Sequence, residues 1–185
     1  MSENTKLALK QAFMNLLEEH PFDDITVNMI AEECHVNRNT LYYHFQDIYD
    51  LLNYAMDLEL KALIAQNEAN ESFRKQFNRL YDFIMERQKI VYHIYYSMER
   101  DVLERFLMQT TKTTLMDSIS EKMKSYPIPK SRKEIIVHSL AYVFVGYFLD
   151  WIRDGMQEDI GEKFEDIIRL AESNEDILLS ILAQH

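Results

Sequence analysis

The sequence predicts an all-α protein of about nine helices. Only three glycines and three prolines occur among 185 residues, so the chain has few of the residues that form tight turns between strands. Apolar residues recur at helical spacing from the start, as in Leu9, Phe13, Leu16 and Leu17. Asp154-Gly155, the one pair typical of a β-hairpin turn, follows a long helical pattern instead. These observations favour long helices over a sheet.

The composition narrows the class of protein further. A chain of 185 residues can bury one good core or two small ones, and 47% hydrophobic residues argue against disorder. The single Cys34 excludes an internal disulfide and a multi-cysteine metal site. Because the N-terminus also lacks the pattern of a signal peptide, we expect a cytoplasmic protein.

The first helices are short and close together. The first is expected at about residues 3–19 and ends at His20-Pro21, after which Phe22 and Ile25 anchor a loop in the core. The second, at about 27–34, has Thr26 as its N-cap and turns Val27, Ile30 and Ala31 inward.

A turn and a third helix follow. His35 lies where the chain must turn, with a positive φ that His tolerates more often than most residues, and Val36 points back into the core. The third helix, at about 38–45, begins after the N-cap Asn37 and turns Leu41 and Phe45 inward.

The rest of the chain also reads as helix. Asp47 is the expected N-cap of a fourth helix that runs to about residue 66, with Asp50 in its first turn. Later helices are expected at about 71–87, 89–97, 99–125, 131–154 and 162–184. Pro127 and Pro129 separate two of them, Gly155 is a C-cap, and Ser173 with Asp176 can start a new turn. We expect a three-helix helix-turn-helix domain at 1–50, with its turn motif at about 26–45, and a helical domain at 51–185.

The third helix leaves one polar row facing outward, and such a row can enter a DNA groove. The row consists of Arg38, Asn39, Thr40, Tyr42, Tyr43 and His44. The charge of the chain argues against DNA binding. The net charge is −11, and residues 1–52 contain three basic and nine acidic residues. Binding to DNA must therefore rest on hydroxyl, amide and helix N-terminal contacts to phosphate.

The segment from residue 26 to residue 52 resembles the DNA-binding domain of TetR/AcrR-type transcriptional regulators. The resemblance rests on the pattern Thr26-Val27-x-x-Ile30-Ala31-x-x-x-x-Val36-x-Arg38-x-Thr40-Leu41-Tyr42-x-His44-Phe45-x-Asp47-x-x-Asp50-Leu51-Leu52. Within the family, Gly146-x-x-x-x-Trp151-x-x-x-Gly155 resembles a subgroup with a shared C-terminal helix. Within that subgroup, residues 37–50 resemble regulators of dihydroxyacetone kinase operons. The resemblance implies an all-helical homodimer that binds a palindromic operator and has a C-terminal ligand and dimerisation domain.

Three residues depart from the family pattern. His35 replaces the usual glycine of the turn, Tyr43 replaces a frequent basic residue, and Ile48 replaces a frequent lysine. Each lost cation removes a phosphate contact and flattens the salt dependence of DNA binding.

The resemblance assigns roles to the outward residues by position. Arg38 would bind a guanine edge and Asn39 an adenine, whereas Thr40 and Tyr42 would contact phosphate or a thymine methyl. The full DNA-contacting set is Thr26, Asn28, Asn37, Arg38, Asn39, Thr40, Tyr42, Tyr43 and His44. The alternative is that this row is simply a solvated helix face.

A homodimer would place two reading helices about 34–36 Å apart, or a multiple of that distance, so the C-terminal half must supply a two-fold contact. The predicted seam lies on the last two helices, where Gly146 would allow close approach. It comprises Val143, Tyr147, Trp151, Ile167, Leu170, Leu178 and Ile181. The alternative is that these residues form core within one chain.

An aromatic cluster in the second half has two interpretations. Tyr92, Tyr95, Tyr96, Phe106 and Tyr142 are candidates to surround an effector, although aromatic stripes at helical spacing are more often plain core. His93 and His138 lie among aromatic residues on separate predicted helices. They are candidates to line an effector cavity, but a role as satisfied core histidines is the favoured explanation.

Residues 135–152 are apolar almost all round but short for a membrane span and interrupted by polar residues. Burial on several sides explains them better, and no membrane partner is expected.

Nothing in the sequence resembles a nucleophile motif, a phosphate-binding glycine loop or a zinc-binding helix, so we expect no enzyme, cofactor or metal. The favoured function is a transcriptional repressor whose partners are a double-stranded operator, a second copy of the chain and an unknown small-molecule effector. Two alternatives are control by a protein coactivator and a helical interaction protein that does not bind DNA.

Overall fold

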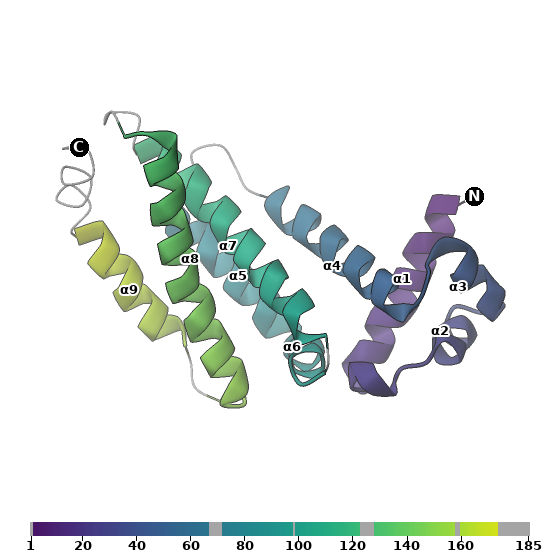
Figure 1. The fold of residues 1–185 in the computed structure, drawn as a ribbon. Helices are drawn as coiled ribbons and strands as arrows, with labels where there is room; N and C mark the ends of the chain where they lie inside the picture. Colours follow the sequence, from purple (N-terminus) through teal and green to yellow (C-terminus); the bar gives the residue numbers. More distant parts are fainter. Residues whose placement is uncertain (1, 67–71, 98, 123–127, 158–159, 174–185) are drawn as a thin grey trace. The chain divides into compact units, whose positions relative to one another are not determined.

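The computed structural model describes residues 2–66, 72–97, 99–122, 128–157 and 160–173. Within these residues the chain forms nine α-helices, one short 3-10 helix and no strand (Figure 1), which confirms the all-α prediction. The elements are α1 (Ser2–Glu19), η1 (Phe22–Asp24), α2 (Val27–Glu33), α3 (Arg38–His44), α4 (Ile48–Ile64), α5 (Phe73–Glu86), α6 (Gln88–Tyr95), α7 (Arg100–Lys122), α8 (Lys130–Arg153) and α9 (Gly161–Ser173).

The local signals placed the helix ends well. The C-cap of α8 is Asp154, one residue before the predicted Gly155. Gly155 has a φ of 82° and ends the helix with two backbone bonds, Gly155 N to Ile152 O at 3.0 Å and Met156 N to Trp151 O at 3.0 Å. The 3-10 helix η1 was not predicted, although the burial of its first residue, Phe22, was. The predicted helix at 162–184 is described only to Ser173, and a new start at Asp176 lies outside the described residues.

The chain divides into two compact units, which we call the first unit (1–62 and 84–106) and the second unit (63–83 and 107–185). The expected domain boundary at residues 50 and 51 differs from this division. The difference arises because α6 returns to pack on α1, with Ile90, Val91 and Ile94 buried in the first unit.

The core of the first unit is built around α1, which packs against α2, α3 and α6. Leu9, Phe13 and Leu17 of α1 are fully buried, as predicted, and Leu16 is half-buried. Phe22 lies edge-on to Phe13, with ring centroids 6.1 Å apart, and so seals the end of this core. This packing holds α2 and α3 on one side of α1.

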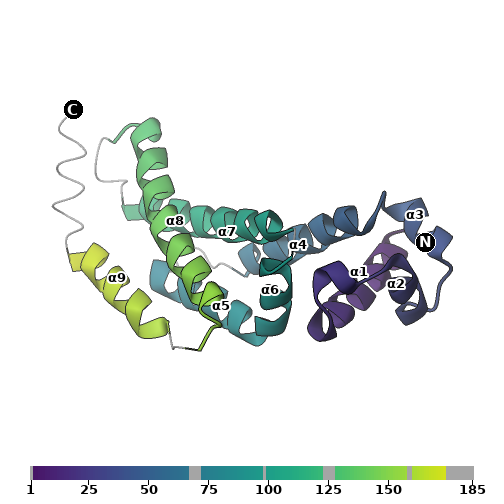
Figure 2. The same ribbon diagram turned by 60° about the horizontal axis from the view of Figure 1, so that its bottom comes forward.

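The second unit has an aromatic core between α5, α8 and α9. Phe77 lies 5.2 Å from Phe144, 5.7 Å from Phe148 and 4.7 Å from Phe164, measured between ring centroids. Helix α8 runs between α7 and α9 in both ribbon views (Figures 1 and 2). Its Phe144 and Phe148 supply ring contacts to this core.

Helix α8 is long and apolar enough to cross a membrane by length and composition alone. Its inner side is nevertheless built into the second unit, where Ala141, Phe144, Phe148 and Ile152 are buried with three further residues. Burial in a core explains the apolar residues on that side of the helix.

Candidate nucleic-acid interface

The turn between α2 and α3 is closed by backbone bonds around His35. His35 has a φ of 54°, as predicted, so it adopts the left-handed conformation that glycine usually supplies. His35 N donates to Glu32 O at 3.0 Å, and Val36 N donates to Ala31 O at 2.9 Å. These two bonds satisfy carbonyl groups at the end of α2 and turn the chain sharply into α3.

Cys34 lies at the C-cap of this same turn and is half-buried. Burial raises the pKa of its thiol. The thiol therefore stays protonated near neutral pH and acts as a small packing group.

Helix α3 has one buried side and one open side. Leu41 and Phe45 are buried, as predicted, and hold the helix on the first unit. Tyr42 is 54% exposed and Tyr43 is 82% exposed, while Arg38 and Asn39 are exposed beside them. Thr40 and His44 are half-buried, so the open row is narrower than predicted.

Two predicted caps fix the start of the motif's helices. Thr26 Oγ1 accepts from Met29 N at 3.3 Å, and Asn37 Oδ1 accepts from Asn39 N at 2.8 Å. The hydroxyl proton of Thr26 and the amide protons of Asn37 remain available as donors toward a phosphate. Asn28 is exposed in the first turn of α2, next to Thr26.

The start of α4 is capped by its own carboxylates. Asp47 Oδ1 accepts from Asp50 N at 2.8 Å, which confirms the predicted cap, and Asp50 Oδ2 accepts from Gln46 N at 3.1 Å. These bonds occupy the amide groups that would otherwise face a phosphate. Ile48 is half-buried and supplies no charge there.

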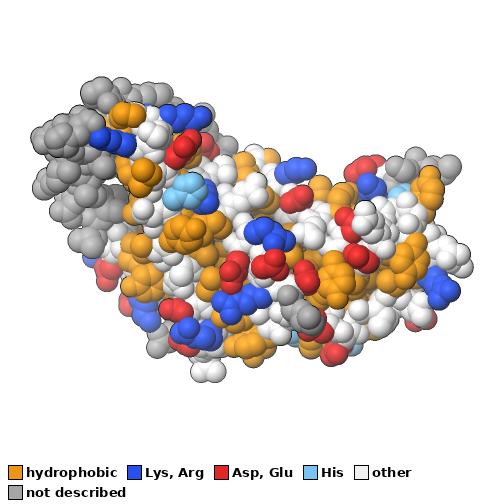
Figure 3. Space-filling model, in the orientation of Figure 1, with side chains coloured by type: hydrophobic (Ala, Val, Ile, Leu, Met, Phe, Trp, Pro, Cys, Tyr) orange, Lys and Arg blue, Asp and Glu red, His pale blue; other side chains and the backbone are white. Residues whose placement is uncertain are grey.

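Basic side chains are dispersed on the face of the molecule that Figure 3 shows. On the face in Figure 3, Lys and Arg lie among Asp and Glu, and the described residues form no continuous basic patch there. Contacts to DNA would therefore come from the turn, the caps and the outward row of α3, as the composition indicated.

The residues named for an effector site are divided between the two units. Tyr95 and Phe106 are buried in the first unit. Tyr92 of α6 and Tyr96, the C-cap of that helix, are exposed with ring centroids 4.6 Å apart. Tyr142 belongs to α8 in the second unit and is 65% exposed. Tyr95 and Phe106 therefore pack as core.

The residues named for a dimer seam fall into three groups. Val143 and Tyr147 are exposed on α8, and Ile167 of α9 is half-buried. Trp151 is buried beside Phe148, so little of it is left for a partner. The side chain of Leu170, and the whole of Leu178 and Ile181, lie outside the described residues.

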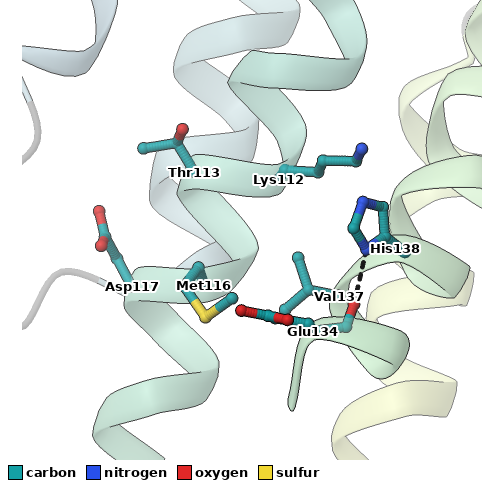
Figure 4. Close-up of a pocket in the computed structure, with 7 residues that line it drawn as sticks. All are labelled: Lys112, Thr113, Met116, Asp117, Glu134, Val137 and His138. Atoms are coloured by element: carbon teal, nitrogen blue, oxygen red, sulfur yellow. Dashed lines mark hydrogen bonds between the residues drawn. The ribbon is translucent and has the colours of Figure 1, made fainter. Parts of the chain in front are cut away.

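The two histidines of the second half differ in setting. His93 is half-buried and bonds through Nδ1 to the carbonyl oxygen of Leu17 at 2.7 Å, which is a structural role. His138 is exposed on α8, so the core role expected for it is wrong, and it lines a pocket between α7 and α8 instead (Figure 4). The pocket holds about 300 Å³ and is lined by Lys112, Thr113, Met116, Asp117, Glu134, Val137 and His138. Apart from His138, sequence reasoning missed these residues, because their spacing matches no binding motif.

The fold and the exposed α3 define a helix-turn-helix DNA-binding protein. The family description "Bacterial regulatory proteins, tetR family" matches residues 11–55, and "Transcriptional regulator C-terminal region" matches residues 71–181. The chain belongs to the TetR family of transcriptional regulators. Among curated proteins, no sequence matches it.

Solved structures agree on the fold. The dihydroxyacetone kinase operon activator DhaS has a TM-score of 0.75 at 19% identity, over 97% of this chain and 98% of the other. A tetR-family regulator from Streptomyces coelicolor has a TM-score of 0.67 at 16% identity, over 98% and 87%. NalD, the secondary repressor of the MexAB-OprM multidrug efflux pump in Pseudomonas aeruginosa, has a TM-score of 0.56 at 22% identity, over 91% and 97%.

Family membership decides between the broad function classes. The protein is a DNA-binding transcription regulator of a non-enzymatic family. A helical interaction protein without DNA binding, the third alternative from the sequence, is set aside.

Proposed function

We propose that the protein is a cytoplasmic homodimer that represses transcription by binding a palindromic operator and is released by an effector bound to its C-terminal half. The observation that carries this proposal is the open row of α3, where Arg38, Asn39 and Tyr42 project from a helix whose start is capped by Asn37. Arg38 has the fork geometry that pairs with guanine, and Asn39 has the amide that pairs with adenine.

One copy of α3 reads too few base pairs to select a single operator. Two copies related by a two-fold axis read both halves of a palindrome. The need for symmetry makes a dimer surface part of the proposal.

A stripe of exposed residues on α8, which we call the α8 stripe, is the proposed dimer surface. It consists of Ile135, Tyr142, Val143, Gly146 and Tyr147. A Cβ at Gly146 would meet nothing within 4 Å in the protomer, so the helix backbone is open to a neighbour there. Exposed apolar residues that follow one side of a helix are typical of a protein contact.

The dimer is tested by measuring mass in solution with Val143→Glu and Tyr147→Glu together. We expect the wild type to have the mass of two chains and the double variant that of one, because two carboxylates per copy would be buried unpaired. Asn78→Glu, at an exposed position of α5, is the control and should remain a dimer. A wild type with the mass of one chain at micromolar concentration contradicts the proposal.

Activation of transcription, instead of repression, is a second candidate function. The solved neighbours include a protein described as an operon activator and one described as a repressor, so activation, with control by a protein coactivator, is the alternative. A reporter gene behind the protein's own upstream region separates the two. Deletion of the regulator should raise expression under repression and lower it under activation.

Operator binding is tested by a gel shift with the DNA upstream of the protein's own gene. We expect a specific complex that unlabelled upstream DNA displaces and random DNA of equal length does not. Arg38→Ala and Tyr42→Ala should each weaken it, and their failure to do so would overturn the assignment of α3 as the reading helix.

A further inference from the structure

The pocket between α7 and α8 is charged at both ends. Lys112 of α7 and His138 of α8 lie near each other, while Asp117 lies on the opposite side (Figure 4). Met116 and Val137 lie between these ends. A pocket of about 300 Å³ is at the lower end of the range for small-molecule sites, so the occupant must be small.

The positive end has two free groups. No ion pair involves Lys112 among the described residues, so its half-buried ammonium is available to a ligand. His138 Nδ1 lies 2.9 Å from the carbonyl oxygen of Glu134. Because a carbonyl oxygen can only accept, Nδ1 carries a proton in this contact, and Nε2 is the ring nitrogen left to face a ligand beside the ammonium.

Two carboxylates line the pocket, Asp117 at the end opposite Lys112 and Glu134 between that end and His138. Glu134 lies beside Met116 and Val137 in Figure 4 and meets a cation only at 3.9 Å, from the largely exposed Lys130. An exposed pair at that distance contributes little, so the Glu134 carboxylate remains open to a ligand. Asp117 is exposed on α7 and makes no ion pair among the described residues.

We propose that this pocket binds a small zwitterion, whose carboxylate pairs with Lys112 and whose ammonium pairs with Asp117 and Glu134 across an apolar chain lying on Met116 and Val137. A ligand with a single charge would leave the charged groups at the opposite end of the pocket unpaired. The pocket should therefore bind a zwitterion more tightly than a singly charged analogue. The inference rests on the proposed function, because it names the chemical class of the effector.

Binding is tested by titration calorimetry on the full chain. The probes are glycine, 4-aminobutanoate and 6-aminohexanoate, which differ in charge separation, together with butanoate, hexanoate, butylamine and hexylamine. We expect at least one of the two longer zwitterions to bind about tenfold or more tightly than its singly charged analogues. If none of the three zwitterions binds, or if an analogue of equal length binds equally well, the proposal is overturned.

Variants locate the site. Lys112→Met and the double variant Asp117→Asn/Glu134→Gln should each weaken zwitterion binding about tenfold or more. Lys89→Met on α6 and Glu162→Gln/Asp166→Asn on α9 make the same charge changes at exposed positions and should leave it unchanged. Unchanged binding in the pocket variants, with helical content intact, would place the ligand elsewhere and overturn the proposal.

A gel shift with the operator separates the two proposals. Operator binding without any binding of the zwitterion series refutes the pocket and leaves the DNA function standing. Zwitterion binding by a chain that recognises no DNA site refutes the proposed function and leaves the pocket standing.

Discussion

His93 Nδ1 lies 2.7 Å from the carbonyl oxygen of Leu17, which joins α6 to the last turn of α1. In a regular helix that carbonyl would accept from the amide four residues later, but residue 21 is proline and has no N–H. The imidazole N–H therefore supplies the missing donor, and it does so from a helix 76 residues away in the chain. The bond ties the helix-turn-helix to the part of the chain that follows α5.

Removing this donor should destabilise the fold. We expect His93→Ala to lower the free energy of unfolding by about 1–3 kcal/mol, because a half-buried carbonyl loses its partner. His93→Gln, which keeps an N–H donor, should recover part of the loss. His138→Ala, at an exposed position, is the control. Urea unfolding measures all three, and an unchanged midpoint in His93→Ala would show that the bond contributes nothing.

The strained turn makes a second prediction. A residue other than glycine in the left-handed region costs roughly 1–2 kcal/mol, so His35→Gly should stabilise the protein by about 0.5–1 kcal/mol after glycine's own entropic cost. Cys34→Gly, one residue earlier at a φ of −84°, gains no such relief and should destabilise it. The same unfolding measurements compare the two, and a loss of stability in His35→Gly contradicts this account of the turn.

Glu99, which precedes α7, leads to a prediction about how the stability of the protein depends on pH. Burial raises the pKa of its carboxyl, the Asp101 charge adds to the effect, and Arg105 opposes it. The folded-state pKa thus exceeds the unfolded value, so the favourable contribution of this group is present at low pH and is lost as pH rises through the folded pKa. Glu99→Gln should therefore stabilise the protein at neutral pH.

The gain from Glu99→Gln should shrink as the pH falls below the folded pKa of Glu99 and vanish below its unfolded pKa, because the carboxyl is then neutral in both states. Thermal unfolding at a series of pH values measures this difference. Asp57→Asn, at an exposed position in the middle of α4, is the control and should show little dependence of this kind. A gain that persists at low pH would show that the variant acts through packing.

The absence of a basic residue at position 43 of α3 leads to a prediction about the salt dependence of operator binding. Tyr43 is 82% exposed and stands where related sequences often carry a basic residue. Tyr43→Lys should tighten operator binding at low salt and steepen the dependence of log K on log salt by about 0.9 per protomer. Fluorescence anisotropy over a range of salt concentrations measures the slope, and an unchanged slope would mean that position 43 does not face a phosphate.

Features that depend on neighbouring residues could be predicted from the sequence. Features that depend on contacts between distant helices could not. The caps at Thr26, Asn37 and Asp47 and the positive φ of His35 each depend on a few neighbouring residues, so the sequence was sufficient to place them. The return of α6 onto α1 was not predicted, because its signal is a proline and a histidine far apart in the chain.

The candidate site residues also differ in whether local patterns or long-range packing place them. Arg38, Tyr42 and Tyr43 were assigned outward from helical periodicity, which also fixed Leu41 inward. Tyr95 and Tyr96 are adjacent tyrosines that the sequence alone does not distinguish. Tyr95 is 5% exposed and Tyr96 is 55% exposed, because tertiary packing decides which aromatic residues join a core. The pocket between α7 and α8 depends on how two helices meet, and no short pattern encodes that.

Selection of operator sequences from a pool of random duplexes tests the central claim most directly. With the wild-type chain, we expect enrichment of a palindrome whose half-sites are centred about 34–36 Å apart or a multiple of that distance. With Arg38→Ala, the same positions should lose their preference for guanine while the spacing is kept. Recovery of no enriched sequence, or of one half-site without its symmetric mate, would contradict a dimer that reads DNA through α3.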